Sequence, residues 1–346
     1  MRSATSFLRL SLLVCCIVGV PAGYGQSLNW SSRSTHPNVS NVGGSYERNG
    51  VSAVAWNGGI WVAETSTQGC SGVNGHSDCP VMISNNLGSG GGSSIYFSVP
   101  APAYSTYFVG GQILGNSNPA LLAVGTTLYL AVNDSYGSAY IFYSTDGSNF
   151  NGTLSGNWTQ NYLIGYSPSL ALDSSSNTLY VGYWNSETYN PILCSANAST
   201  HTSNGCQNLT GLRTMNFNPG IAVYDGLLYM GFEDRGDSHC LYFYKYTPST
   251  NGFAFWNPLN CGEQTSSAPS LATHNGELYV AFRTNDSSQK FTVRVSTTGN
   301  DLGYRQQPGF STDGPPDLFD MNLVGVNEMQ EFQVNSHVLN TSIGTP

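Results

Sequence analysis

The chain has 346 residues and a formal net charge of −9, with only 9% of its residues charged and 12% aromatic. An acidic chain with so few cations lacks the positive surface that nucleic-acid binding requires, so no nucleic-acid partner is expected. Its 40 glycines and 21 tyrosines are typical of a turn-rich, all-β protein.

The N-terminus has the layout of a secretory signal. Arg2 and Arg9 supply positive charge, an apolar run follows from Leu10 to Val20, and small residues come next. The run is too short to cross a bilayer, and a lipid anchor at Cys15 is disfavoured because no small residue precedes it. We therefore predict a signal peptide at residues 1–25, a single mature domain at residues 26–346, an extracellular or periplasmic location and no transmembrane segment.

One hairpin pattern recurs five times along the rest of the chain. Each copy has a short apolar strand, a tight turn and a second strand with a central aromatic residue. The copies are Gly50–Thr65, Asn118–Asn133, Ser167–Trp184, Asn218–Glu233 and Ala268–Asp286. Three of the turns contain Asn-Gly or Asp-Gly, which type I′ hairpins favour because both central residues take positive φ.

The spacing of the copies indicates the architecture. After the first copy the aromatic residue recurs about every 50 residues, the length of a four-stranded propeller blade. The aromatic residues are Trp61, Tyr129, Tyr180, Tyr229 and Tyr279. The longer first interval predicts an insertion near Gly88–Gly92.

The segments between the copies supply the outer strands. We expect them at Ala139–Ser144, Trp158–Ile164, Pro191–Ser195, Leu212–Phe217, Cys240–Tyr246, Phe253–Leu259, Phe291–Ser296 and Leu302–Gln306. A last blade is expected from Pro316–Asn322, Leu323–Glu328 and Glu331–Leu339, completed by Leu28–Ser32 from the N-terminal end. Pairing the two chain ends removes an exposed sheet edge. The prediction is an all-β, six-bladed β-propeller of four-stranded antiparallel blades, with the N-terminal strand closing the last blade.

Six cysteines follow the predicted signal peptide, in three neighbouring pairs. Sequence alone allows 15 connectivities, but nearest-neighbour pairing keeps each bridge within one blade. We predict the bridges Cys70–Cys79, Cys194–Cys206 and Cys240–Cys261, which agree with export to an oxidising compartment. No cysteine, histidine or acidic spacing matches a zinc site or a calcium loop, so neither a metal nor a cofactor is expected.

A short motif connects the repeats to a known family. Ser144-Thr145-Asp146-Gly147-Ser148-Asn149-Phe150 resembles the Asp-box of sialidase-type (BNR) propellers, although it is one residue short and ends in Phe, and Ser296–Gly299 is a more degenerate copy. In that family the box is a structural turn away from the active site, and its Asp is expected to accept backbone N–H bonds. The family's catalytic set, three arginines, a Tyr-Glu pair and an acidic proton donor, has no matching motif here, so no catalytic residue is assigned.

A candidate ligand site follows from the repeat register. The residues that follow the aromatic segment of each second strand are expected to surround one mouth of the central channel. The candidate ligand-binding residues are Trp184, Glu233, Arg283, Asn133 and Asp234. Acidic and basic groups suit sugar hydroxyls, and an aromatic ring suits a pyranose face, so the predicted partner is an extracellular glycan or protein ligand. The bland alternative is that these residues are solvated strand ends, with Trp184 partly buried.

Two other functions stay open at this stage. A glycoside hydrolase on a sialidase-like framework would need two carboxylates facing one pocket, and Glu233 and Asp234 are a poor pair because adjacent strand residues point to opposite sides. The tripeptide Arg235-Gly236-Asp237 is compatible with a cell-surface adhesion module. The sequence favours a binding protein over an enzyme; if the protein is an enzyme, a glycoside hydrolase is expected.

Overall fold

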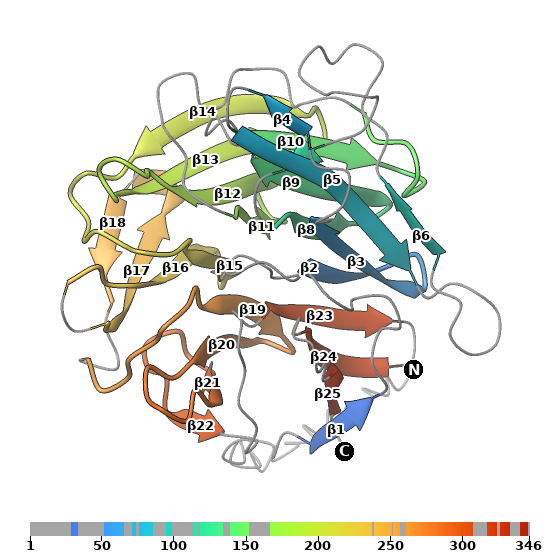
Figure 1. The fold of residues 1–346 in the computed structure, drawn as a ribbon. Coiled ribbons are helices and arrows are strands. Elements are labelled where there is room, and N and C mark those ends of the chain that lie inside the picture. Colours follow the sequence, from blue (N-terminus) through green and yellow to red (C-terminus); the bar gives the residue numbers. More distant parts are fainter. Residues whose placement is uncertain are drawn as a thin grey trace, which may run out of the picture.

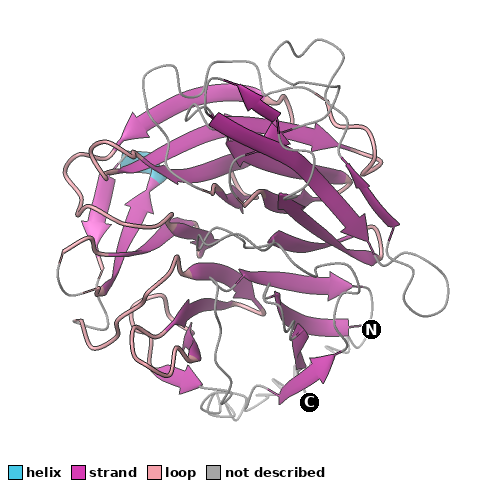
Figure 2. Cartoon of the chain, viewed as in Figure 1, coloured by secondary structure: helices cyan, strands magenta, loops and turns pink. Residues whose placement is uncertain are grey.

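The computed structural model consists almost entirely of β-strands (Figure 2). It describes residues 29–33, 52–65, 71–73, 76–85, 95–98, 114–115, 118–133, 139–151, 167–236, 239–250, 252–256, 261–306, 317–323, 326–332 and 340–344. Within these ranges the one helical element is a short 3-10 turn, η2 (Pro248–Thr250). No helix in them is long and apolar enough to cross a membrane. The all-β prediction is confirmed.

The strands of the described ranges form six antiparallel sheets, named I to VI here (Figure 1). Sheet I contains β2 (Ser52–Trp56), β3 (Gly59–Thr65), β4 (Ser71–Val73), β5 (His76–Asn85), β6 (Ile95–Ser98) and β7 (Leu114–Gly115). Sheet II contains β8 (Ala120–Val124), β9 (Thr127–Asn133) and β10 (Ala139–Ser144). Sheet III contains β11 (Ser169–Asp173), β12 (Thr178–Trp184), β13 (Pro191–Asn197) and β14 (Thr202–Asn208).

The remaining three sheets have four strands each. Sheet IV contains β15 (Gly220–Tyr224), β16 (Leu227–Glu233), β17 (Leu241–Thr247) and β18 (Gly252–Phe255). Sheet V contains β19 (Ser270–His274), β20 (Glu277–Arg283), β21 (Phe291–Ser296) and β22 (Tyr304–Gln306). Sheet VI contains β23 (Asp317–Leu323), β24 (Val326–Phe332), β25 (Asn340–Gly344) and β1 (Asn29–Arg33), so the predicted N-terminal strand pairs with the C-terminal one. The predicted strand Trp158–Ile164 and the loop Gly88–Gly92 lie outside the described residues.

The first two strands of each repeat form the predicted hairpin. At three turns both central residues have positive φ, as a type I′ turn requires: Asn57 and Gly58, Asp225 and Gly226, and Asn275 and Gly276. The second strands β9, β12, β16 and β20 share one burial pattern, in which all but the first residue are buried. Such strands are covered on both faces, which explains their nearly continuous apolar sequence.

The prediction of an outer strand at Leu212–Phe217 was wrong. The fourth strand of sheet III is β14, Thr202–Asn208, which is polar and mostly exposed because it is the outer edge. The segment Leu212–Phe217, in which polar and apolar residues alternate, instead leads into sheet IV. Its Met215 is fully buried and forms an isolated bridge with Asp234. The alternation therefore marked a linker rather than a strand.

The strand boundaries of sheet VI also differ from the prediction. The first predicted strand, Pro316–Asn322, agrees with β23 within one residue, but its hairpin partner is β24, Val326–Phe332, which spans parts of both later predicted segments. The last strand is β25, beyond Leu339. The alternation of polar and apolar residues is weak here, so the sequence did not fix the turn positions.

The first strands of the sheets lie together in the middle of the molecule, and the later strands lie toward its periphery (Figure 1). β2 contacts β8 and β23, and contacts continue from β8 to β11, β15, β19 and β23. The approach is close: a Cβ atom placed on Gly220 of β15 would lie 2.4 Å from the carbonyl oxygen of Pro269, just before β19. Ser52 Oγ accepts a hydrogen bond from the backbone N–H of Leu121 at 2.9 Å, which links sheets I and II.

Four of the five repeated aromatic residues contact the next sheet. Tyr129 Oη donates to the carbonyl oxygen of Ala198, in the hairpin after β13. Tyr229 Oη donates to the carbonyl oxygen of Gly299, in the hairpin after β21, at 3.2 Å. Tyr180 meets Tyr246 of β17 with ring centroids 6.1 Å apart. The repeat in sequence thus reflects a contact between neighbouring sheets.

The turn at Ser144–Phe150 forms the equivalent contact with Trp61. Asp146 Oδ1 accepts the backbone N–H groups of Ser148 at 2.8 Å and of Asn149 at 2.7 Å, as predicted. These bonds, with that from Asn149 first, hold the pKa of Asp146 well below its usual value. Gly147 has φ of 76°, and a Cβ atom there would lie 2.2 Å from Cη2 of Trp61. Only glycine fits both the backbone and the space.

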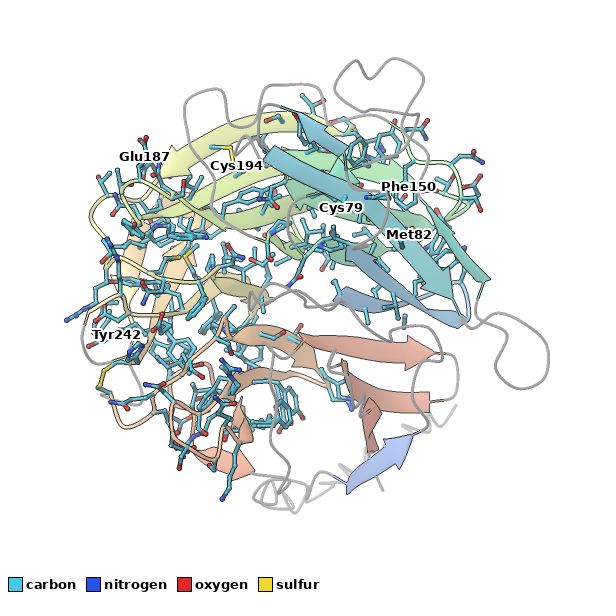
Figure 3. The ribbon with its side chains drawn as sticks, viewed as in Figure 1. Cys79, Met82, Phe150, Glu187, Cys194 and Tyr242 are labelled. Carbon is cyan, nitrogen blue, oxygen red and sulfur yellow. A yellow bond between two sulfur atoms is a disulfide. The ribbon has the colours of Figure 1, made fainter. Side chains whose placement is uncertain are left out.

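Two of the predicted disulfides are present. Cys194 and Cys206 link neighbouring strands of sheet III, and Cys240 and Cys261 link the start of β17 to the linker that leaves sheet IV (Figure 3). Cys79 is also disulfide-bonded, while its predicted partner Cys70 lies outside the described residues. Each observed bridge closes a short loop, which restricts the unfolded chain.

Candidate functional site

The residues predicted to share a register do share one. Asn133, Trp184, Glu233 and Arg283 are each the last residue of the second strand in their sheet, namely β9, β12, β16 and β20. All four are buried, with exposed fractions of 2%, 5%, 0% and 4%. Equivalent ends of equivalent strands place four different side chains on one face of the molecule.

A linker crosses this face before each of sheets IV and V. In the first, Arg235 N–H donates to the carbonyl oxygen of Thr214 at 3.0 Å. In the second, Asn285 N–H donates to the carbonyl oxygen of Gln264 at 3.1 Å. These bonds cover the strand ends, and they explain why residues expected at an open mouth are buried instead.

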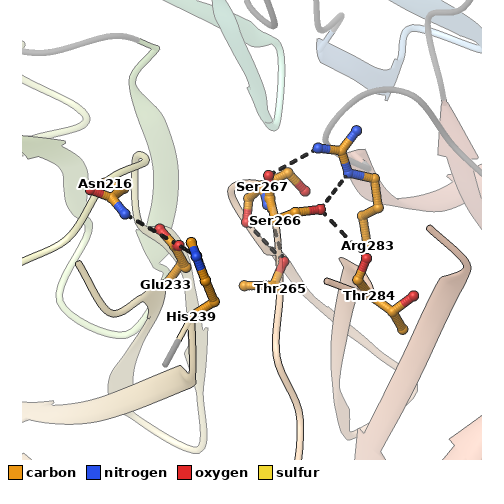
Figure 4. A network of polar contacts seen from close by, with 8 residues as sticks. All are labelled: Asn216, Glu233, His239, Thr265, Ser266, Ser267, Arg283 and Thr284. Carbon is orange, nitrogen blue, oxygen red and sulfur yellow. Dashed lines mark hydrogen bonds and ion pairs between the residues drawn. The ribbon is translucent and has the colours of Figure 1, made fainter. Parts of the chain in front are cut away.

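Glu233 lies at the centre of a small polar network (Figure 4). Its Oε1 is bonded to Nδ1 of His239, in the turn after β16, and accepts a hydrogen bond from Nδ2 of Asn216 at 3.3 Å. Among the described side chains its Oε2 has no hydrogen-bond partner. Burial raises the pKa of Glu233, while the bonds from His239 and Asn216 act in the opposite direction.

Arg283 is held by the linker that enters sheet V. Its Nε donates to Oγ of Ser266 at 2.9 Å, and its Nη2 donates to the carbonyl oxygen of Ser266 at 2.9 Å. In Figure 4 the segment Thr265–Ser267 separates Arg283 from Glu233. The guanidinium therefore has a defined orientation before any ligand arrives.

The same linker connects the acidic and the basic group. Thr265 N–H donates to the carbonyl oxygen of His239 at 2.9 Å, and Ser266 N–H donates to that of Arg283 at 3.3 Å. The segment thus contacts the Glu233 network on one side and Arg283 on the other. Two neighbouring sheets bring a carboxylate and a guanidinium to the same face.

Asp234 belongs to a different environment from Glu233. Its Oδ2 lies 3.5 Å from Nη1 of Arg213. The guanidinium of Arg213 also lies 4.3 Å above the ring of Tyr242. The two adjacent carboxylates therefore point to different partners, as expected for neighbouring strand residues.

Trp184 and Asn133 are the two remaining candidates. The ring of Trp184 packs against that of Tyr189 with centroids 5.4 Å apart, within the core that sheets III and IV share. With an exposed fraction of 5% it offers a ligand little more than an edge. Asn133 ends β9 opposite Ala139 and is also buried.

Sequence reasoning missed the partners of the site. His239, Asn216 and Ser266 come from a turn and two linkers, whose positions on this face depend on how the sheets pack. The one available signal was that each of these residues lies close in sequence to a strand end of sheet IV or V. In the described part of the chain, no group of three or more His, Cys, Asp or Glu side chains is arranged to hold a metal ion.

Of three comparisons with known proteins, only the one with solved structures finds similar proteins. No family model matches the sequence, and no curated protein matches it. A solved protein of unknown function from Dyadobacter fermentans matches with a TM-score of 0.58 and 13% identity, over 87% of this chain and 96% of that one. A neuraminidase-like protein from A/bat/Guatemala/164/2009 matches with a TM-score of 0.57 and 10% identity, over 92% and 95%.

A third solved structure adds a sialidase to this set. Trypanosoma rangeli sialidase, in complex with the inhibitor DANA, matches with a TM-score of 0.50 and 10% identity, over 85% of this chain and 54% of that one. At such low identity the likeness concerns the fold and not the activity. The chain is therefore similar to sialidase-like β-propeller proteins in its fold.

Proposed function

We propose that the protein is a secreted, six-bladed β-propeller that binds a glycan or another extracellular ligand at the face described above. Six sheets, first strands that contact one another in cyclic order, and the pairing of β1 with β25 support a closed ring. The disulfides favour an oxidising compartment, in agreement with a signal peptide at residues 1–25.

One observation carries the binding proposal. The second strands repeat in length, burial and central aromatic residue, yet their last residues are Asn133, Trp184, Glu233 and Arg283. A position that served only the repeat would be expected to keep its residue type, as the aromatic position does. Diversity at one position of a repeated framework is typical of a site built on that framework.

The proposed site lies at the ends of β16 and β20, where Glu233 and Arg283 are buried beneath the linkers, with Asn133 on the same face. A guanidinium oriented by Ser266 is a donor for ligand hydroxyl or carboxylate oxygens. Because Trp184 is packed against Tyr189, we assign it to the rim of the site. Asp234 is paired with Arg213, so we assign it the role of holding that guanidinium. Sugars and polar peptides both present the acceptors that such a site needs.

A glycoside hydrolase is the second candidate, and the geometry favours it less. Hydrolysis requires a second carboxylate about 5–10 Å from the first. In the described residues around Glu233, Asp234 is paired with Arg213, and Glu263 is paired with Arg294. Each of these two carboxylates is already bonded to a cation of the protein, so neither is an evident second member of such a pair with Glu233. An adhesion module receives little support, because Arg235 lies 3.1 Å above the ring of Tyr189 and is thereby occupied.

The test is a glycan array probed with purified residues 26–346. The variants are Arg283→Gln and the control Asp225→Asn, which removes an exposed charge in the turn between β15 and β16, at the end of β16 opposite Glu233. We expect Arg283→Gln to weaken wild-type binding by about 1–3 kcal/mol, the usual cost of losing a central contact, and Asp225→Asn to leave it unchanged. Unfolding curves check that both variants fold.

Three outcomes would contradict the proposal. Binding that is undiminished in Arg283→Gln, Glu233→Gln and Trp184→Ala would place the site elsewhere. An array without any bound glycan would remove the glycan as the ligand. Release of sugar from chromogenic glycosides would favour the hydrolase.

A further inference from the structure

The group that a ligand can reach in sheet IV is an imidazole rather than a carboxylate. The side chain of Glu233 has an exposed fraction of 0%, whereas that of His239, bonded to it, is 45% exposed. A ligand that approaches this face therefore meets His239 first, and Glu233 lies behind it. The arrangement matters because the repeat register alone points to Glu233.

The backbone holds His239 in place. Its φ of 49° lies in the left-handed region, which non-glycine residues seldom occupy without support from their surroundings. Its carbonyl oxygen accepts the N–H of Thr265 at 2.9 Å. The next residue, Cys240, is bonded through its carbonyl oxygen to Asp234 N–H and through its sulfur to Cys261. The backbone of His239 and of the residue after it is thus held by bonds to neighbouring segments.

Glu233 fixes the ring itself. Nδ1 of His239 is bonded to Oε1 of Glu233, and Asn216 donates to the same oxygen at 3.3 Å. A neutral imidazole that donates its Nδ1 proton to a carboxylate keeps the lone pair of Nε2 for another partner. The carboxylate thereby selects the tautomer and the orientation of the exposed nitrogen, as such partners do for histidines in metal sites.

The charged groups near the ring come from several segments. Glu233 is the last residue of β16 and Asp234 follows it directly. Glu263 belongs to the linker and is paired with Arg294 of β21, and Arg283 is the last residue of β20. Asp234 is paired with Arg213. Glu233 is therefore the carboxylate in direct contact with the ring, and burial raises the pKa of this carboxylate.

We propose that His239 is the ligand-contacting residue of sheet IV, with Nε2 bonded to a hydroxyl group of the ligand, and that Glu233 is a positioning residue that acts through it. This inference rests on the proposed function. A hydroxyl both donates and accepts hydrogen bonds, so it fits Nε2 as a neutral acceptor and as a protonated donor. A hydroxyl-rich ligand is the class that this geometry fits.

The positioning role is tested without a ligand. Nitrogen-15 NMR of histidine-labelled wild type, at a pH where the ring is neutral, should show His239 protonated at Nδ1 with Nε2 unprotonated. Glu233→Gln should move the ring toward the Nε2–H tautomer that free histidine prefers. A wild-type ring in the Nε2–H form, or a tautomer unchanged in Glu233→Gln, would overturn the positioning role.

The contact is tested on the same glycan array. His239→Asn is the variant of choice because asparagine tolerates the left-handed backbone conformation, and Asp225→Asn, in the turn at the opposite end of β16, is again the control. We expect at least a tenfold loss of affinity in His239→Asn for the glycan that wild type binds, and no loss in the control. Wild-type affinity in His239→Asn would overturn the contact alone. An array without bound glycan would overturn the proposed function together with the contact, while the tautomer measurement would still decide the role of Glu233.

Discussion

Replacing Gly147 by alanine would test how closely sheets I and II pack against each other. A Cβ atom at this position would lie 2.2 Å from Cη2 and 2.5 Å from Cζ3 of Trp61, and 3.0 Å from Trp56. The Trp61 ring cannot easily move aside, because it is 3% exposed and its Nε1 donates to the carbonyl oxygen of Trp56 at 3.0 Å. The substitution therefore forces two sheets apart.

The expected cost has two parts. A φ of 76° is left-handed, and an L-residue there costs roughly 1–2 kcal/mol. Overpacking of a close-packed core adds about 1–3 kcal/mol, while the lower entropy of the unfolded chain returns about 0.4–1 kcal/mol. The free energy of unfolding should fall by roughly 1–5 kcal/mol in total.

Gly58→Ala is the matched control. Gly58 has φ of 77°, within one degree of Gly147, but no atom lies within 4 Å of its added Cβ. The control variant carries the backbone cost without the overpacking. The difference in unfolding free energy between the two variants therefore measures the overpacking against Trp61, at about 1–3 kcal/mol. Urea unfolding followed by tryptophan fluorescence, with midpoints compared at a common m-value, measures it.

An equal loss of unfolding free energy in the two variants would refute the reasoning. If Gly147→Ala and Gly58→Ala destabilise by the same amount, within about 0.5 kcal/mol, then Trp61 does not press on the turn. The repeated aromatic residues would then need another explanation than contact between sheets.

Three further predictions concern stability. Burial raises the pKa of Glu233 above its usual 4.5. The contribution of Glu233 to the free energy of unfolding is therefore largest below pH 4.5 and is lost as the pH rises through the raised pKa. Urea unfolding from about pH 4 to 8 should show wild type losing stability relative to Glu233→Gln, and a constant difference would contradict this. Tyr129→Phe leaves the buried carbonyl of Ala198 without its hydroxyl donor and should lower the free energy of unfolding by about 1–3 kcal/mol. Tyr183→Phe removes a buried hydroxyl without a hydrogen-bond partner among the described residues, so it should be neutral or stabilising. Equal costs would argue against a stabilising hydrogen bond between Tyr129 and Ala198. Removing either disulfide by double serine substitution should lower the free energy of unfolding by roughly 3 kcal/mol. The cost should be slightly larger for Cys240–Cys261, because its sequence separation is 21 rather than the 12 of Cys194–Cys206. The opposite order would mean that loop closure is not the main source of the stabilisation.

Local patterns predicted much of the fold. The Asn-Gly and Asp-Gly turns predicted the hairpins, because positive φ at both central residues is a property of four consecutive residues. The pairing of Cys194 with Cys206 was also accessible, because the two are nearest neighbours in the sequence, although the strand that carries Cys206 was not predicted. The error at Leu212–Phe217 has the converse cause: the alternation of polar and apolar residues in a linker with one buried residue, Met215, resembles that of a strand.

The candidate site could be predicted only in part. Register placed Glu233 and Arg283 at equivalent strand ends, because the two-residue period and the repeat length are written in the chain. Their burial was not predictable, because it depends on linkers that fold back over the strand ends. For the same reason the only sequence signal for His239 was its closeness to the ends of β16 and β17.

The sequence by itself thus determined the first two strands of the five repeats, their hairpin turns, the repeat and two of the disulfide pairs, all of which depend on residues close together in the chain. Tertiary structure alone decided that the repeated aromatics contact the next sheet, that Gly147 must be glycine, and that His239 rather than Glu233 is exposed. The physical reason is distance along the chain. Contacts within a hairpin join residues a few positions apart, whereas Tyr129 and Ala198, or Tyr229 and Gly299, meet only when separate sheets pack together.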